Sequence, residues 1–270
     1  ILGDIRDYDS VFNAIKGCNV VIHLAALIGI PYSYRSPLAY IKTNLEGTYN
    51  VLEASKNLKI KNIIVTSTSE VYGSAQYLPM DEKHPVNSQS PYAASKASAD
   101  QLALSYYRSF DLPVKIIRPF NVYGPRQSER AIIPTIIKQA LQNNKKNFDL
   151  GNLNPTRDFS YVDDTVDAFI KVMKNKKVFG QILNVGSNKN ISILLLCKEI
   201  MKLTKNKKLI NINSVRKRPK LSEVENLKCN NKKIRKITNW KPKINLKNGL
   251  KKTLEWFKKN ENSNSNQYII

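Results

Sequence analysis

The sequence predicts an α/β fold: a doubly wound parallel sheet with a smaller, mixed α/β lobe in the C-terminal part. Two observations predict it. Up to about residue 150, runs of β-branched and other apolar residues alternate with longer stretches of helical periodicity, as in successive βαβ units. Beyond that point the strand and helix signals become shorter and less regular. We therefore expect a main domain at 1–150, a lobe at 151–260 that partly returns to the main sheet, and a tail at 261–270.

The predicted strands of the main sheet are continuous apolar runs, which is typical of parallel strands buried on both faces. They lie at 19–24, 61–67 and 114–117, and Pro119 is expected to end the third of them. A shorter strand is expected at 182–185, in the less regular part of the chain.

The predicted helices follow these strands. In 37–57, apolar residues recur at intervals of three and four, so that they share one helical face. Ser90 and Pro91 form a favoured helix start, a capping residue followed by proline, and this helix should continue to residue 108 or 110. Further helices are expected at 132–141, 193–203 and 249–259.

The net charge of +23 is strongly basic, and most of the excess lies near the C-terminus. Residues 201–260 contain 20 Lys and Arg against 3 acids, a net charge of +17. The lysines lie among asparagines and isoleucines, without the alternating aromatic residues of a platform for single-stranded nucleic acid. We therefore expect a solvated, lysine-rich surface and no nucleic-acid partner.

The cysteines and the apolar runs exclude several other classes. Cys18, Cys197 and Cys229 are odd in number and widely spaced, and only two histidines accompany them, so neither a disulfide framework nor a metal site is expected. The longest apolar run, at 20–30, is too short to cross a bilayer, and no secretory signal is recognisable. These features predict a cytoplasmic protein with reduced thiols and no membrane partner.

Two segments of the main domain carry candidate catalytic groups. Tyr92 and Lys96 are four residues apart on a predicted helix, so the ammonium can lie beside the phenol, lower its pKa and make it a general base. Thr68, Ser69 and Glu70 follow the strand at 61–67, and the carboxyl ends of parallel strands are where ligands bind. A capped turn would explain the hydroxyl residues but not the acid. Together the two segments indicate an active site.

Seven motifs in order along the chain resemble the extended short-chain dehydrogenase/reductase family of nucleotide-sugar epimerases and dehydratases. They are residues 23–26, 43–48, 68–73, 92–96, 118–126, 157–159 and 218–219, and they span nearly the whole chain. The resemblance implies a Rossmann-like sheet, NAD as cofactor and a nucleotide-diphosphate sugar as substrate. It also implies a homodimer that pairs the helices at 37–57 and 91–108.

The same resemblance implies the site residues. The catalytic residues would be Thr68, Ser69, Glu70, Tyr92 and Lys96. The NAD-binding residues would be Asp4, Ile5, Leu24, Ala25, Ala26, Asn44, Thr66, Ser67, Tyr92, Lys96 and Pro119. The substrate-binding residues would be Ser33, Thr68, Asn121, Arg126, Arg157 and Arg218. The arginines suit this role because guanidinium groups match phosphate oxygens in a bidentate way.

The chain departs from the family in its glycines. None of the ten glycines forms a GxxGxxG or GxGxxG motif, so the phosphate loop and the residue that distinguishes NAD from NADP are expected to precede residue 1, in a first βαβ unit that is missing. The chain as given is accordingly expected to bind NAD weakly, to show no turnover and to be prone to aggregation.

Three reactions share this scaffold. A 4-epimerase needs no carboxylate at Glu70, whereas a 4,6-dehydratase would use Glu70 as the base for the C5 proton. Many dehydratases have an aspartate where this chain has Ser69, which leaves the identity of the acid open. UDP-glucuronate decarboxylases also carry the glutamate, but usually have Gly-Lys-Arg in place of Ser95, Lys96 and Ala97.

Residues 27–34 and 128–134 resemble N-acetylglucosamine-type 4,6-dehydratases of nonulosonic (legionaminic) acid pathways. The favoured function is therefore an NAD-dependent 4,6-dehydratase acting on a UDP- or GDP-N-acetylglucosamine-type sugar. The decarboxylase, the epimerase and a non-catalytic basic binding module remain alternatives.

Overall fold

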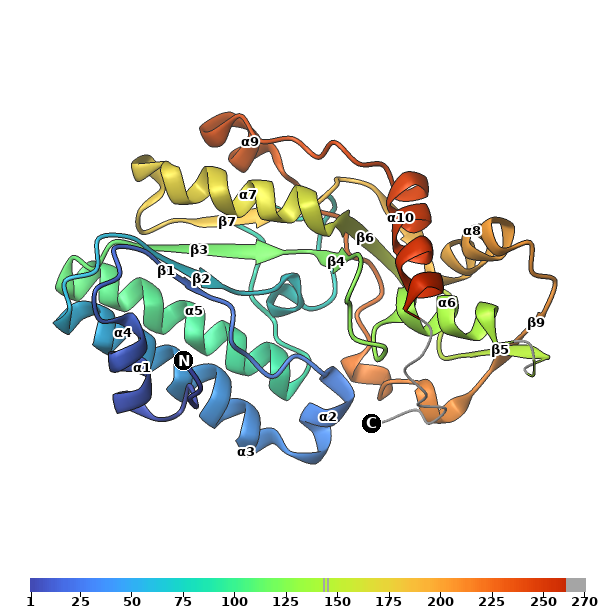
Figure 1. Cartoon of the computed structure of the whole chain (residues 1–270), viewed down its shortest axis with the longest axis horizontal. Helices are drawn as coiled ribbons and strands as arrows, with labels where there is room; N and C mark the ends of the chain where they lie inside the picture. The colour runs from blue at the N-terminus through green and yellow to red at the C-terminus, as the bar shows by residue number, and fades with distance from the viewer. Residues whose placement is uncertain (143, 145, 261–270) are drawn as a thin grey trace.

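A four-stranded parallel sheet lies at the centre of the main domain in the computed structural model, which describes residues 1–142, 144 and 146–260 (Figure 1). Its strand order is β1 (Val21–His23), β2 (Ile63–Thr66), β3 (Val114–Pro119) and β7 (Ile182–Val185). Side chains from the inner strands, among them Ile63, Ile64 and Val65, are fully buried, as continuous apolar runs require. The expected α/β fold with a parallel sheet is confirmed.

Helices cover both faces of this sheet (Figure 1). One face packs against α1 (Tyr8–Ile15), α4 (Gly47–Asn57) and α5 (Pro91–Phe110). The other packs against α7 (Val162–Lys174) and α9 (Lys232–Thr238), which bring Phe169 and Ile234 into the core, and Trp240 joins them just after α9. The arrangement is therefore doubly wound.

The lobe is built on two small sheets with a core of its own. The strand order is β4 (Asn121–Tyr123), β6 (Thr156–Tyr161), β8 (Asn190–Ser192) in one sheet and β5 (Asn147–Leu150), β9 (Leu209–Ile212) in the other. The helices α6 (Ile132–Leu141), α8 (Ile193–Thr204) and α10 (Leu246–Lys259) pack against them.

Several segments differ from the prediction. The third strand ends at Pro119 as expected, but it includes Pro119, which pairs in register with Val185, and so extends beyond the predicted residue 117. The strand at 182–185 pairs with β3 and so belongs to the main sheet, which is where the chain returns from the lobe. The helices α1, α2 (Ile30–Arg35) and α7 had not been expected.

The continuous helix expected at 37–57 is divided into three parts: α3 (Pro37–Tyr40), the π-helical η1 (Ile41–Glu46) and α4. A π-helical turn inserts an extra residue and rotates the following side chains, and such turns are frequent at functional sites. Here it contains the fully buried Asn44.

The remaining short helices are η2 (Ser69–Tyr72), η3 (Lys176–Val178), η4 (Ser214–Arg216) and η5 (Lys220–Ser222). Among the described residues no helix has both the length and the apolar character needed to cross a membrane. The expected tail at 261–270 lies outside the described residues.

Candidate active site

The first part of the site is the turn that follows β2. The Ser67 amide bonds to the carbonyl of Ile117 at 2.7 Å, which extends the pairing of β2 with β3 by one residue. Thr68 then caps η2, because its hydroxyl oxygen accepts a hydrogen bond from the amide of Glu70 at 3.2 Å. The cap fixes Glu70 in the first turn of η2, at the carboxyl edge of the sheet, with its side chain largely buried.

The second part is the start of α5. Ser90 caps the helix by accepting a hydrogen bond from the amide of Ala93 at 3.1 Å, as the sequence predicts. Tyr92 is buried in the first turn, where its phenol forms a hydrogen bond with Thr68 and feels the charge of Glu70. The structure thus brings the two predicted catalytic segments together.

The pKa expected for Tyr92 is wrong for the protein chain by itself. Burial raises the pKa of Tyr92 above that of a free phenol, and the charge of Glu70 adds to the rise, whereas the hydrogen bond from Thr68 opposes it. Burial also lowers the pKa of Lys96, although the carboxylate of Asp100 partly offsets this. Tyr92 and Lys96 lie on one helix four residues apart, as predicted, but the groups that act on the phenol are the apolar surroundings, Thr68 and Glu70.

A buried polar network around Asp100, which was not predicted, adjoins this cluster through Ser67. Asp100 is fully buried and accepts hydrogen bonds from Ser67 at 2.7 Å and from the Arg118 guanidinium at 2.9 Å. Arg118 also lies over the ring of Tyr72, with 4.8 Å between the guanidinium carbon and the ring centroid. The spacing of Lys96 and Asp100, again four residues, was the signal that could have identified Asp100.

The side of the site next to β1 has groups suited to a dinucleotide. Asn44 accepts a hydrogen bond from the amide of Leu27 at 2.8 Å and donates to Ser95 on α5 at 2.9 Å, so it ties the turn after β1 to the catalytic helix. The Thr66 hydroxyl is buried at the end of β2 and has no partner among the described residues. An unpartnered hydroxyl at the carboxyl end of a central strand fits a ligand rich in hydroxyl groups, such as a ribose.

The other predicted cofactor residues surround the same edge of the sheet. Leu24 and Ala25 are exposed and Ala26 is half-buried in the turn after β1, while Pro119 closes β3. Asp4 is exposed and paired with Arg6, whose hydrogen bonds lower the pKa of Asp4 to about 2. The side chain of Ile5 packs against Gly47, where a β-carbon would come within 2.9 Å of it.

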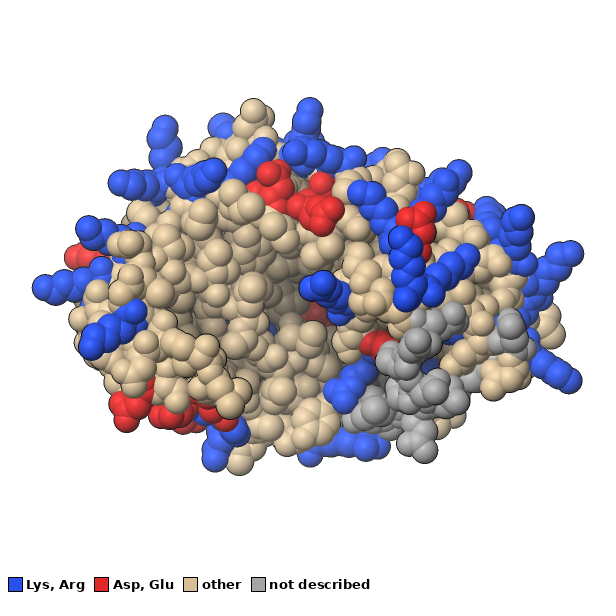
Figure 2. Space-filling model, in the orientation of Figure 1, with Lys and Arg blue, Asp and Glu red and all other residues tan. Residues whose placement is uncertain are grey.

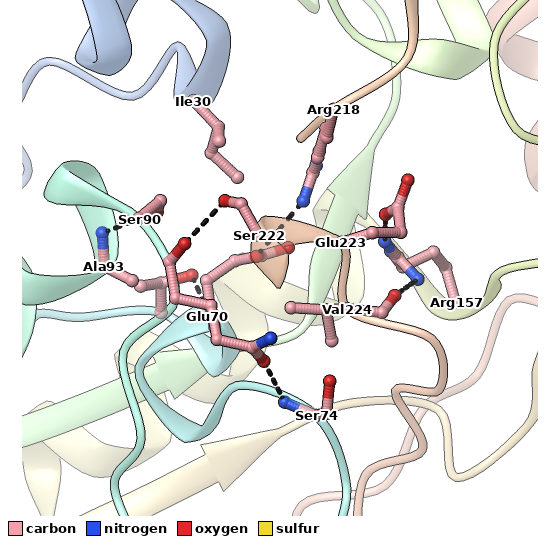
Figure 3. A network of polar contacts seen from close by, with 12 residues as sticks. Ile30, Glu70, Ser74, Ser90, Ala93, Arg157, Arg218, Ser222, Glu223 and Val224 are labelled. Atoms are coloured by element: carbon pink, nitrogen blue, oxygen red, sulfur yellow. Dashed lines mark hydrogen bonds and ion pairs between the residues drawn. The ribbon is translucent and has the colours of Figure 1, made fainter. Parts of the chain in front are cut away.

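The predicted substrate arginines come from the lobe (Figure 3). Arg157, on β6, is buried and pairs with Glu223 at 3.2 Å, and it donates to the carbonyl of Val224 at 2.7 Å. Burial lowers the pKa of Arg157, and the charges of Glu70 and Glu223 oppose this. Arg218 reaches across to the catalytic turn and pairs with Glu70 at 3.4 Å.

Three further predicted substrate residues are placed differently from one another. Asn121 begins β4, and its side-chain oxygen is buried with no partner in the described part of the chain. Ser33 is fully buried and donates to the carbonyl of Ile30 within α2 at 2.7 Å. Arg126 is exposed in a left-handed backbone conformation with φ of 63°. The structure therefore groups Asn121, Arg157 and Arg218 more clearly than Ser33 and Arg126.

Residues 218–223, which we call the strap, close one side of the site. The sequence analysis identified Arg218 but missed the contacts made by Leu221, Ser222 and Glu223. Ser222 donates to the carbonyl of Gln89 at 2.5 Å, so the Tyr34 hydroxyl, 2.6 Å away, must be the donor to Ser222. Gln89 in turn donates to the carbonyl of Leu221 at 2.7 Å. These contacts join the lobe to α2 and to the start of α5, and no sequence pattern marks them.

The charged side chains on the face seen in Figure 2 lie mostly around the rim, while a hollow between the two parts of the molecule is lined largely by uncharged residues. Such a distribution fits a solvated basic surface around a separate binding site. Within residues 1–142, 144 and 146–260 no group of three or more His, Cys, Asp or Glu side chains could hold a metal ion.

Comparison with known proteins places the site in a family. The family model described as GDP-mannose 4,6 dehydratase matches residues 1–253. Human dTDP-D-glucose 4,6-dehydratase is 34% identical over 96% of this chain and 75% of its own length, and the UDP-N-acetyl-alpha-D-glucosaminuronate decarboxylase of Bacillus cytotoxicus is 34% identical over 96% and 82%. The crystal structure of dTDP-glucose 4,6-dehydratase from Bacillus anthracis in complex with NAD has a TM-score of 0.86, 29% identity and coverage of 97% of this chain and 80% of that one. The chain therefore belongs to the GDP-mannose 4,6-dehydratase family of nucleotide-sugar-modifying enzymes.

Proposed function

We propose that the protein is an NAD-dependent nucleotide-sugar 4,6-dehydratase acting on a UDP- or GDP-N-acetylglucosamine-type sugar, as in nonulosonic acid pathways. The observation that carries the proposal is the packing of η2 against the start of α5, which buries Glu70 and Tyr92 in one cluster beside Thr68. A dehydratase needs two bases that act at neighbouring carbons of the sugar. One takes the proton of the C4 hydroxyl, and the other takes the proton bound to C5.

Tyr92 is the base at the C4 hydroxyl. Thr66, Asn44 and Lys96 would hold NAD, which would supply the hydride acceptor and donor when bound. Because burial raises the pKa of Tyr92, the phenolate forms only where positive charge is close, and Lys96 on the next helical turn supplies part of it. Thr68 stabilises the same oxygen by its hydrogen bond.

Glu70 is the base at C5. The ketone formed at C4 acidifies the C5 proton, which passes to the Glu70 carboxylate, and the C6 hydroxyl leaves with a proton as water. Ser69 is buried beside Glu70 in η2 and is the nearest hydroxyl in the position where related dehydratases carry an acid. The proton that leaves with the hydroxyl would come from Ser69, and the C4 hydroxyl proton taken up by Tyr92 would replace it by way of solvent. The protonated Glu70 returns its proton to C5, and the bound cofactor would supply the hydrogen at C6, so that one water is lost overall.

Arg157 and Arg218 hold the diphosphate, and Asn121 supplies an amide to the substrate. Both guanidinium groups are paired with carboxylates in this chain, at 3.2 and 3.4 Å, so each is already oriented toward the site and can exchange an acid for a phosphate. A decarboxylase remains the second candidate, because one relative at 34% identity is described as such an enzyme.

Mass spectrometry of products formed with NAD and a panel of UDP- and GDP-sugars tests the proposal. A dehydratase releases a product lighter by one water, a decarboxylase a product lighter by CO2, and an epimerase a product of unchanged mass. Glu70→Gln should block water loss while oxidation at C4 continues, so reduced cofactor or a 4-keto hexose should accumulate. Release of the 6-deoxy-4-keto product at a near-normal rate by Glu70→Gln would remove Glu70 as the C5 base.

We further propose a homodimer through the outer face of η1, α4 and α5. Leu38 of α3, which leads into η1, Ile41 of η1 and Tyr49 of α4 expose between 44% and 60% of their surface. An open groove of about 570 Å³ on the same face is lined by Leu45, Val86, Ala97, Ser98, Gln101, Leu102 and Ser105. Apolar side chains gathered on neighbouring helices fit a second copy of the same surface. Analytical ultracentrifugation of wild type and Tyr49→Glu tests this, since the charge should convert a dimer to a monomer.

A further inference from the structure

Arg218 forms an ion pair that crosses from the lobe to the catalytic turn. Its guanidinium lies 3.4 Å from the Glu70 carboxylate, and the two side chains expose 24% and 10% of their surface (Figure 3). Although burial opposes it, the charges of Glu70 and Glu223 raise the pKa of Arg218, so the guanidinium stays charged in this position. A single group therefore faces both the proposed C5 base and the proposed diphosphate site.

The ion pair with Arg218 engages one oxygen of Glu70 and holds the carboxylate toward the lobe residue, so a change of partner by Arg218 leaves Glu70 free to turn to the sugar. A diphosphate offers more acceptor oxygens and a larger total negative charge than a carboxylate, so it competes effectively for a guanidinium. We propose that Arg218 is a positioning residue that holds Glu70 in the substrate-free enzyme and releases it when the diphosphate of the nucleotide sugar binds. The inference rests on the proposed roles of Glu70 and of the diphosphate site.

The neighbouring arginine shows why Arg218, and not Arg157, has this role. Arg157 pairs with Glu223, an acid of the strap with no place in the proposed chemistry, and its side chain exposes only 7% of its surface. It is also fixed by a 2.7 Å hydrogen bond to the carbonyl of Val224. The Arg218 pair is longer and more exposed, so it is the easier of the two to exchange for a ligand.

The strap supplies the support that such an exchange needs. Ser222 is bound to Gln89 and Tyr34 on the main domain, while Glu223 is bound to β6, so both the catalytic side and the lobe side anchor the strap beyond Arg218. Arg218 can then change partner while the backbone near it stays in place. Binding of the diphosphate and release of Glu70 from Arg218 are thereby coupled.

The coupling predicts that Glu70 competes with the nucleotide for the guanidinium of Arg218. When a protein group that binds a ligand is engaged elsewhere, the apparent affinity is reduced in proportion to the fraction of protein molecules in which that group is free. Removing the competing carboxylate by Glu70→Gln should tighten the binding of a nucleoside diphosphate without sugar by about fivefold to tenfold. Arg218→Gln should weaken it, and in the Arg218→Gln background the effect of Glu70→Gln should fall below about twofold.

Calorimetric titration of UDP and of GDP into wild type, Glu70→Gln, Arg218→Gln and the double variant is the test. If Glu70→Gln tightens nucleotide binding only by removing a negative charge, the tightening should persist in the Arg218→Gln background. Glu223→Gln in that same background is the matched control, and it should then tighten binding as well. Tightening that depends on Arg218 supports the proposal. Equal affinity of wild type and Glu70→Gln, or equal tightening with and without Arg218, overturns it.

Glu70→Asp provides a second variant that keeps the charge. Because the ion pair already spans 3.4 Å, loss of one methylene should break it, and nucleotide should again bind more tightly. Unchanged affinity in Glu70→Asp contradicts the proposal even if Glu70→Gln folds poorly. The proposed function is tested separately, since Glu70→Gln either stops water loss or does not, whatever its nucleotide affinity.

Discussion

The catalytic turn and the strap face each other across the site but are built in opposite ways. The turn after β2 and the start of α5 contain Glu70 and Tyr92, each about 8% exposed, between a central strand and a helix of 20 residues. In the strap, Leu221 is 88% exposed and the only regular structure is one turn, η5. Groups that must meet reacting atoms are thus held by regular elements, whereas groups that bind and release a substrate lie on an irregular, more exposed segment that side-chain hydrogen bonds hold in place.

The largest expected effect is in the rigid region. Tyr92→Phe removes the phenol oxygen but keeps the ring, which packs edge-on against Tyr40 with 6.2 Å between centroids. Turnover should fall by about 10³-fold, as expected for loss of a general base, while the fold and sugar binding are kept. Steady-state rates and circular dichroism check this.

Tyr123→Phe is the matched control for this variant. It removes a buried tyrosine hydroxyl from the core of the lobe, where the hydroxyl is 3.3 Å from the carbonyl of Leu246, and turnover should stay within a few-fold of wild type. Activity of Tyr92→Phe close to that of Tyr123→Phe would exclude Tyr92 as the base.

The next effect tests what makes the region rigid. Asp100→Asn leaves Arg118 buried without a countercharge, because the ion pair at 2.9 Å exposes at most 2% of either side chain. The free energy of unfolding should fall by about 3 kcal/mol. Urea denaturation measures it, and Glu199→Gln, which breaks the exposed pair with Lys202 on α8, should change it by less than about 0.5 kcal/mol. Similar losses of unfolding free energy in Asp100→Asn and Glu199→Gln would show that the buried ion pair contributes no more to stability than the exposed one.

Much of the rigid region could be predicted from the sequence. Continuous apolar runs identified β1, β2 and β3, and the Ser90–Pro91 start identified α5. These signals are local, since burial on both faces and helix capping act on residues close in sequence. The pKa of Tyr92 could not be predicted, because desolvation depends on everything packed around the phenol.

The strap could not be found in the same way. Ser222 contacts Gln89 and Tyr34, which are 133 and 188 residues away along the chain, and nothing in the residue pattern at 218–223 encodes those partners. The π-helical turn at η1 is another long-range result, because it places Asn44 against Leu27 and Ser95. The family resemblance identified Arg157 and Arg218, but not the acids with which they pair.

An effect of pH on stability, of intermediate size, is expected from His23, the last residue of β1. Burial lowers the pKa of His23 to about 3, and the charge of Lys96 adds to this. The Thr48 hydroxyl donates to the carbonyl of Asn44, so neutral His23 donates to Thr48 at 3.0 Å. Because the folded pKa lies below the unfolded value of 6.5, this stability is complete above pH 6.5 and is lost as the pH falls toward 3.

The free energy of unfolding should therefore fall by about 2 kcal/mol between pH 7 and pH 5 from His23 alone. Urea denaturation at the two pH values measures the fall in wild type. In His23→Gln, which has no titrating group at this position, the difference between the two values should shrink by that amount. An unchanged difference would show that another group causes the acid sensitivity.

The smallest expected effect is in the strap. Ser222→Ala removes the hydrogen bonds to Gln89 and Tyr34, at 2.5 and 2.6 Å, from a segment whose neighbours are exposed. Loss of about 1 kcal/mol should raise KM for the nucleotide sugar by about fivefold with little change in kcat, because the strap positions substrate but not the bases. Thr204→Val, which removes a similar hydroxyl-to-carbonyl hydrogen bond of 2.9 Å at the end of α8, should leave KM unchanged. A fall in kcat of the same size as the rise in KM would mean that the strap also holds the catalytic turn in place, and the contrast between the two regions would be weaker than their burial indicates.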